Sequence, residues 1–86
     1  MALLKSELIY NGKTVSYHRV VHLEIDLATG ACAAVLHSWP SRQDRERLQP
    51  PDLNRRFNFI HTGPDLLADA YAAIKALPYW ADAEDA

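Results

Sequence analysis

The sequence predicts a small α+β fold: an antiparallel β-meander of about four strands, with one C-terminal amphipathic helix packed on one face of the sheet. Segments of alternating apolar and polar residues are separated by turn signals at Asn11-Gly12 and at Gly30. The stretch 64–78 instead repeats its apolar residues at helical spacing between two prolines. The length of 86 residues predicts a single domain, residues 1–86, with a modest core.

The first two strands are predicted to form a hairpin. The segment LLKSELIY, residues 3–10, leads into Asn11-Gly12, a dipeptide that readily supplies the two positive-φ residues of a type I′ turn. The run TVSYHRVVHLEID, residues 14–26, then alternates, apart from Arg19. One face carries Val15, Tyr17, Val21, Leu23 and Ile25, and the other carries Ser16, His18, Val20, His22 and Glu24. We therefore expect a long half-buried strand with both histidines on its solvated face.

A third strand is expected over ACAAVLHSW, residues 31–39, pairing back on the second. Gly30 closes the intervening turn in the left-handed conformation, and Pro40 ends the strand because it has no N–H to donate. The polar segment 41–54 follows, and its conformation is open: a short helix from Ser41, a hairpin, or a flexible extended arm.

The last elements are a fourth strand and the helix. RRFNFIH, residues 55–61, alternates with its two phenylalanines on one face. Pro64 suits the first helical position, Asp65 suits the positive end of the helix dipole, and Pro78 marks the stop. The apolar stripe comprises Leu66, Leu67, Ala70, Tyr71, Ile74 and Leu77. The acidic tail, residues 81–86, is expected to fray.

Charge and cysteine content exclude several kinds of site. A net charge of −2 and an isoelectric point of about 6.0 provide no global positive field for a nucleic-acid backbone. Cys32 is the only cysteine, so no internal disulfide forms. The start MALLKSELIY lacks the basic region of a signal peptide, and no apolar run approaches the ~20 residues of a membrane span. We expect neither signal-peptide secretion nor membrane contact.

The histidines predict no reactive centre. His18 and His22, four residues apart on a strand, lie about 13 Å apart, too far for one zinc ion with bonds of about 2.1 Å. The third strand can bring His37 opposite one of them, which leaves a cross-strand pair open as an alternative. His61 fits a turn or capping role, with no nucleophile motif beside it. We expect no catalytic residue, no metal site and no cofactor, and a His-dependent or metal-dependent hydrolase is the weakest hypothesis.

Aromatic and basic residues are the candidate partner-binding residues. Trp39 ends the third strand and Tyr79-Trp80 follow the helix stop, and aromatic side chains are favoured at interface hot spots. Arg45 and Arg47 would orient a partner through charge. The basic segment also supports an alternative, a small nucleic-acid-binding regulatory protein that would use Arg42, Arg45, Arg47, Arg55 and Arg56.

Three stretches together resemble small proteins of tailed phages and prophages that are encoded among tail or other virion genes. They are YHRV at 17–20, the serine and arginine elements of SRQDRER at 41–47, and the closing helix that ends in Leu77-Pro78, aromatic residues, Ala81 and Asp82. The resemblance implies a non-enzymatic structural or assembly protein, associated with the tail, that works through protein–protein contacts. It implies partners among copies of the chain or other virion proteins, with nucleic acid less favoured, and a location in the virion or the bacterial host cytoplasm.

Overall fold

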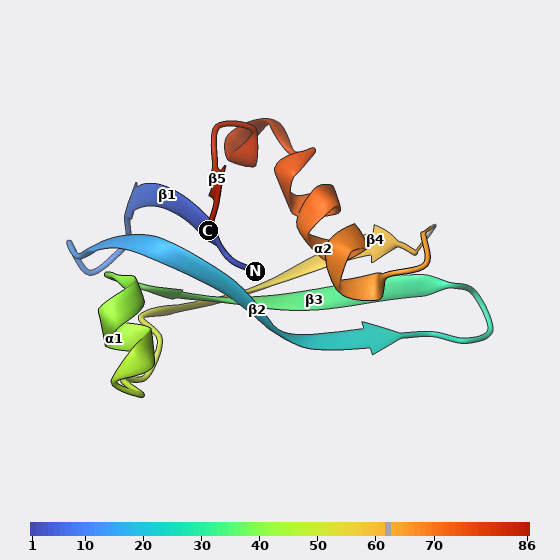
Figure 1. The fold of residues 1–86 in the computed structure, drawn as a ribbon, viewed down its shortest axis with the longest axis horizontal. Coiled ribbons are helices and arrows are strands. Elements are labelled where there is room, and N and C mark those ends of the chain that lie inside the picture. Colours follow the sequence, from blue (N-terminus) through green and yellow to red (C-terminus); the bar gives the residue numbers. More distant parts are fainter. Residues whose placement is uncertain (62) are drawn as a thin grey trace.

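The structure, a computed structural model, describes residues 1–61 and 63–86 and belongs to the α+β class, as predicted (Figure 1). A five-stranded antiparallel sheet has the order β4-β3-β2-β1-β5, and two α-helices accompany it. The elements are β1 Leu3–Leu8, β2 Thr14–Ile25, β3 Ala31–Trp39, α1 Arg42–Glu46, β4 Leu53–Ile60, α2 Leu66–Lys75, the 3₁₀ helix η1 Pro78–Trp80 and β5 Glu84–Asp85. The predicted meander is thus extended by a fifth strand beside the first.

The β1–β2 hairpin forms, but its turn is not of type I′. The Gly12 N–H donates to the carbonyl of Ile9 at 3.0 Å, and the Ile9 N–H donates to the carbonyl of Lys13 at 2.9 Å. Gly12 has a φ of +82°, whereas Asn11 is not among the positive-φ residues of the described chain. The Asn11 side-chain oxygen instead accepts the Lys13 N–H at 3.1 Å. This local bond favours a turn in which only the glycine is left-handed.

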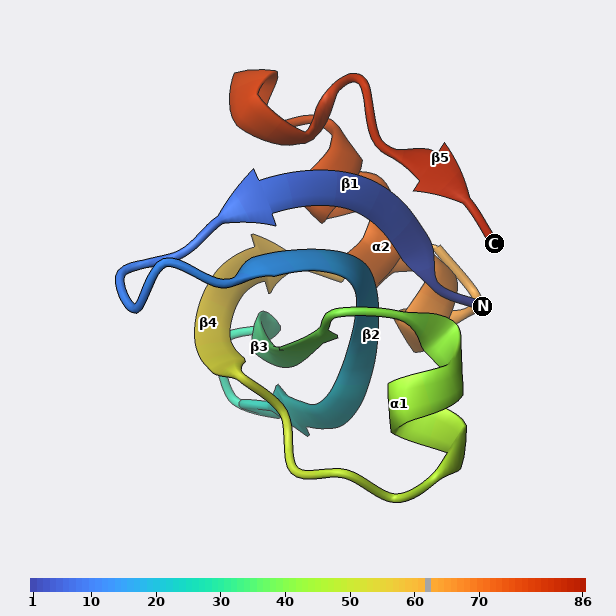
Figure 2. The ribbon, with the colours of Figure 1, turned by 90° about the vertical axis from the view of Figure 1, so that its left-hand side faces the viewer.

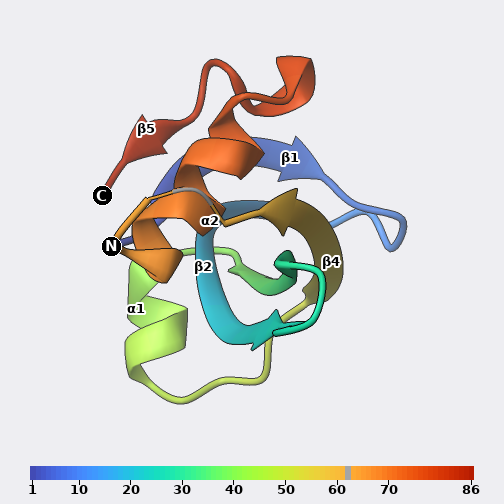
Figure 3. The same cartoon turned by 90° about the vertical axis from the view of Figure 1, so that its right-hand side faces the viewer.

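The sheet is strongly curved, and β2 contains an irregularity that contributes to this shape. Views along the long axis from its two ends show the strands curling around that axis (Figures 2 and 3). The register of β2 against β3 shifts between Val20 and His22, as at a β-bulge, which increases local twist and interrupts the alternation of side chains. Val20 is therefore buried and Val21 is 45% exposed, opposite to the predicted faces.

Helix α2 covers the curved sheet and supplies much of the core. Asp65 is the N-cap, and its side chain accepts the Ala68 N–H at 3.1 Å, so the helix begins after Asp65 and not at Pro64 as predicted. Ala70, Tyr71 and Ile74 are buried against the sheet, while Leu67 and Leu77 of the predicted stripe are 39% and 43% exposed. The main core cluster comprises Leu3, Val20, Cys32, Ala34, Leu36, Phe59, Ala70, Tyr71, Ile74, Trp80 and Ala83.

Tyr71 links this helix to the irregularity in β2. Its hydroxyl accepts the buried N–H of Val20 at 2.9 Å and donates to the carbonyl of Met1 at 2.9 Å. A buried N–H at a disrupted part of a ladder needs a partner, and the tyrosine provides one. This hydrogen bond therefore holds α2 against the irregular part of β2.

The segment 41–54 begins as a short helix, one of the alternatives left open above. The Ser41 side chain accepts the Asp44 N–H at 3.3 Å, which caps α1 at its start. After the helix the chain returns along β3, where the Trp39 indole N–H donates to the carbonyl of Gln49 at 2.9 Å. Along the long axis, α1 lies toward the end of the molecule that carries the β1–β2 turn, away from α2 (Figure 1).

The acidic tail, expected to fray, is paired with the N-terminus. Ala2 and Ala86 exchange two backbone hydrogen bonds of 3.1 and 2.9 Å, beside the pairing of β5 with β1. Trp80 and Ala83 are 2% and 6% exposed, so the core anchors the chain just before β5. The burial of these two residues explains why the polar end of the chain remains beside β1.

Candidate functional site

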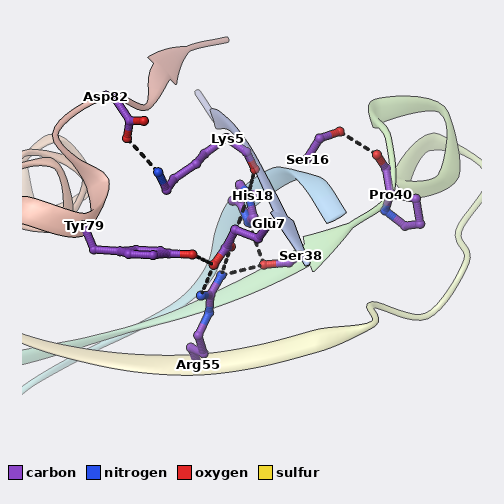
Figure 4. Close-up of polar contacts among 9 residues, drawn as sticks. All are labelled: Lys5, Glu7, Ser16, His18, Ser38, Pro40, Arg55, Tyr79 and Asp82. Carbon is purple, nitrogen blue, oxygen red and sulfur yellow. Dashed lines mark hydrogen bonds and ion pairs between the residues drawn. The ribbon is translucent and has the colours of Figure 1, made fainter. Parts of the chain in front are cut away.

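The most concentrated polar chemistry in the described chain is a group of five side chains, three of them buried, here called the polar cluster. Glu7, His18, Ser38 and Arg55 come from four adjacent strands, β1 to β4, and Tyr79 comes from η1 (Figure 4). His18 and Ser38 are fully buried and Glu7 is 7% exposed. The cluster lies on the concave side of the curved sheet, where Trp80 packs edge-on against the ring of His18 at a centroid distance of 5.0 Å.

An ion pair joins the two outer strands of the cluster. Arg55 donates from Nη1 to Glu7 Oε2 at 2.9 Å and from Nη2 to Glu7 Oε1 at 2.7 Å, and the Tyr79 hydroxyl donates to Oε2 at 2.6 Å. Burial alone would raise the pKa of Glu7, but the hydrogen bonds from Arg55 and Tyr79, with the nearby positive charge, outweigh burial and hold this pKa below its usual value. Glu7 is therefore an ionised, fully engaged carboxylate.

His18 is held as a neutral imidazole by the same cluster. Its Nε2 lies 2.7 Å from the carbonyl of Lys5, which only accepts, so Nε2 carries the proton. Its Nδ1 then accepts from the Ser38 hydroxyl at 2.7 Å, and Ser38 Oγ accepts from Arg55 Nη2 at 3.1 Å. Burial lowers the pKa of His18, more than the Lys5 carbonyl and Glu7 raise it, in agreement with the neutral form.

The predicted solvated face for both histidines is therefore wrong for His18. The strand is covered on both sides at this point, and partners from β1 and β3 complete the hydrogen bonds that a buried imidazole requires. His22, beyond the register shift, is exposed as predicted and lies 3.3 Å from Glu24. The two rings do not converge.

Ser38, His18 and Glu7 have the residue types of a hydrolytic triad, but their arrangement differs. The Nε2 of His18 is bonded to a backbone carbonyl and lies 3.6 Å from Glu7 Oε1. Ser38 and His18 have no exposed surface, and Trp80 closes the cluster on the side of the core. A nucleophile needs a substrate within reach, so this geometry suits a structural network that fixes four strands relative to one another.

The five predicted partner-binding residues lie in three places. Tyr79, a member of the polar cluster, packs against Trp80, with Tyr79 56% exposed and Trp80 only 2% exposed. Trp39 is 5% exposed in a separate cluster with Ala2 and Tyr17. Arg45 lies in α1 and Arg47 is its C-cap. Their role in partner binding stays a prediction; Tyr79 and Arg47 are exposed, and Arg45 is half-buried.

The arginines of the nucleic-acid alternative are largely engaged within the chain. Arg55 pairs with Glu7, Arg56 pairs with Glu24 across β3, and Arg42 pairs with Glu46 at 3.1 Å one helical turn away. These pairs reduce the positive charge that the segment presents to a phosphate backbone.

Metal ligation finds no support in the part of the chain that the structure describes, where no group of three or more histidine, cysteine, aspartate or glutamate side chains is placed to hold an ion. His61 bonds through Nδ1 to Asp69 at 2.7 Å, and the same carboxylate accepts the Gly63 N–H at 2.8 Å. His61, directly after β4, is thereby bonded to α2.

The sheet also has one long open edge. β4 is last in the strand order, and Asn54, Arg56, Asn58 and Ile60 are exposed along its eight residues. At the opposite end, β5 covers β1 at Leu3 and Leu4. The sequence did not indicate which edge would be open, because strand order depends on contacts between distant segments.

Comparison of the chain with protein-family models, with curated proteins and with solved structures gave no match. Among the described residues, no helix has the length and apolar character needed to cross a membrane.

Proposed function

We propose that the protein is a non-enzymatic structural or assembly protein of a phage or prophage particle, associated with the tail, and that it acts through protein–protein contacts. The open edge of β4 carries the proposal. An edge strand of eight residues presents backbone donors and acceptors that no neighbouring strand pairs, and these readily pair with a strand of another chain. The sequence resemblance to small virion proteins supports the same kind of role.

The polar cluster supports a structural role because it stiffens the surface that a partner would meet. The Glu7–Arg55 pair ties β1 to β4, and Tyr79 and Trp80 pack against it. A rigid edge loses little conformational entropy on binding, which favours assembly. The burial of Ser38 and His18 argues against their use in catalysis.

Co-purification with particles tests the proposal. Particles induced from the bacterial strain that encodes the chain are purified on a density gradient, and the chain is quantified by mass spectrometry in particle and soluble fractions. We expect enrichment with tail proteins. A chain that stays entirely in the soluble fraction would contradict the proposal. A gel shift at low salt checks the nucleic-acid alternative, which requires an affinity that falls steeply as salt rises.

A further inference from the structure

We propose that the partner of the β4 edge is β4 of a second copy of the chain, in an antiparallel pairing about a two-fold axis at Phe57. This inference deepens the proposed function and rests on it for the view that the chain works by protein contacts. The partner is a second copy of the chain, and the two strands pair in one register.

The two edges differ in their suitability for self-pairing. β5 has only two residues, Glu84 and Asp85, and Asp85 is paired with Lys75 of the same chain, so two such strands would share only a short contact. β4 is eight residues long, and its two charged residues, Arg55 and Arg56, are already paired with Glu7 and Glu24 of the same chain. Two copies of β4 can therefore approach without an uncompensated charge.

The side chains of β4 are also compatible with pairing to a second β4 strand. The strand LNRRFNFI contains aromatic residues, contains no proline or lysine, and is not interrupted by a bulge in its pairing with β3. Proteins that keep an edge strand unpaired commonly place proline, lysine or a bulge on it. Ile60 is 64% exposed near the end of this strand, and a neighbouring strand would remove it from water.

The register follows from the faces of the strand. Opposed residues of an antiparallel pair point to the same face, so a two-fold axis must pass through a residue and not between two residues. An axis at Arg56 would set the two Arg56 side chains directly against each other. An axis at Phe57 instead opposes Arg56 to Asn58 of the second copy, and Asn54 to Ile60, and it pairs residues 54–60 of each copy. We therefore place the axis at Phe57.

In this arrangement the two sheets become one continuous antiparallel sheet with both α2 helices on the same face. The contact is narrow, below the ~1,200 Å² of a standard interface, so we expect a dissociation constant on the order of micromolar. The interface is closed, which distinguishes it from a head-to-tail contact of β4 with β5 that would continue into rings or filaments.

Charge variants at Asn58 test the interface. Asn58→Lys sets a second cation against Arg56 of the other copy, and Asn58→Glu sets a carboxylate there. By sedimentation velocity over a dilution series, we expect the dimer to weaken at least about tenfold with Lys and to tighten about threefold to tenfold with Glu. Gln43→Lys and Gln43→Glu, exposed on α1, are matched controls that leave the dimer unchanged. Circular dichroism verifies that all variants fold.

Cysteine pairs test the register. The double variant Asn54→Cys/Ile60→Cys is expected to form a covalent dimer on oxidation, through two symmetric disulfides, while each single variant does not. Cys32 is buried and remains in all variants. A wild-type chain that stays monomeric at about 1 mM, or a dimer insensitive to both charges at position 58, overturns the inference. If the chain is monomeric but enriched on particles, the inferred dimer is wrong and the proposed function still stands. If the chain is dimeric but absent from particles, the proposed function is wrong and the inferred dimer still stands.

Discussion

Arg55 and Glu7, 48 residues apart in the sequence, form a two-pronged ion pair between strands that are three places apart in the sheet. In a flat sheet such strands would be roughly 14 Å apart, since neighbours are spaced at ~4.8 Å. The strong curvature of this sheet brings the two side chains together over Ser38 and His18 (Figure 4). The pair is therefore both a result of the curvature and a restraint that preserves it.

Removing the cation of this pair should be strongly destabilising. Arg55→Met leaves Glu7, whose side chain is 6% exposed, as a buried carboxylate without its main partner. We expect a loss of about 3 kcal/mol in the free energy of unfolding, measured by urea denaturation. Arg56→Met is the matched control, because its partner Glu24 lies on the surface, and we expect no measurable change for it.

The double variant Glu7→Leu/Arg55→Met separates the cost of an unpaired charge from the value of the pair. Replacing both partners by apolar side chains removes the buried charge, so we expect it to recover at least about half of the loss caused by Arg55→Met. If the double variant is as unstable as the sum of its single variants, the two residues act independently and the role assigned to their pairing is wrong.

Stability should decrease on mild acidification because of His18. Burial lowers the pKa of His18 in the folded chain below the value of 6.5 that it has when unfolded. The stabilisation is therefore complete above about pH 6.5 and is lost as the pH falls from there toward the folded pKa, with a slope of up to about 1.4 kcal/mol per pH unit. Urea denaturation between pH 8 and pH 5 measures this slope.

Two histidine variants show which residue causes the dependence of stability on pH. His18→Gln should remove this part of the pH dependence and lower stability at pH 8, because the bonds to Ser38 and Lys5 are disturbed. Burial also lowers the pKa of His37, so His37→Gln should reduce the slope while leaving stability at pH 8 nearly unchanged. An unaltered slope in His18→Gln would show that the proton is taken up elsewhere.

Local signals were sufficient for several element boundaries. β3 spans residues 31–39, as predicted, because a left-handed Gly30 and the proline at 40 act within a few residues of its ends. β2 begins at Thr14, directly after the predicted turn. β4 starts at Leu53, two residues before the predicted position, since pairing with β3 extends it.

The polar cluster could not be predicted from local sequence patterns. Whether His18 is solvated depends on Glu7, Ser38 and Arg55, which lie 11, 20 and 37 residues away in the numbering and meet only after the sheet has curved. The register shift beyond Val20 has no glycine or proline to mark it. Glu7, a single acid among the apolar residues of the first strand, was the one local sign of a buried charge.

Leu48 should be replaceable by glycine with a gain in stability. It has a φ of +58°, a left-handed conformation that disfavours side chains with a Cβ, and it is 90% exposed, so its side chain contributes little burial. We expect Leu48→Gly to raise the free energy of unfolding by about 0.5 kcal/mol, after the entropy that glycine adds to the unfolded chain is deducted. Thermal unfolding followed by circular dichroism detects the change.

The equally exposed Leu27 provides the matched control for this substitution. It is 89% exposed in the β2–β3 turn and is not among the positive-φ residues. Leu27→Gly should therefore lower stability slightly, by about 0.5 kcal/mol, since the same entropy is added without relief of strain. Equal effects at both positions would mean that backbone conformation does not determine the outcome.

Deleting residues 84–86 should destabilise the chain, although they are acidic and terminal. The deletion removes β5 and both hydrogen bonds between Ala2 and Ala86, and it leaves the outer side of β1 at Leu3 and Leu4 without a neighbouring strand. Because Ala2 and Leu3 are 1% and 0% exposed, we expect a loss of about 1–2 kcal/mol and faster hydrogen exchange at the Ala2 amide. Replacing Glu84 and Asp85 by glutamine and asparagine keeps the backbone pairing and should preserve that protection. If deletion and substitution behave alike, the side chains and not the strand pairing hold the tail in place.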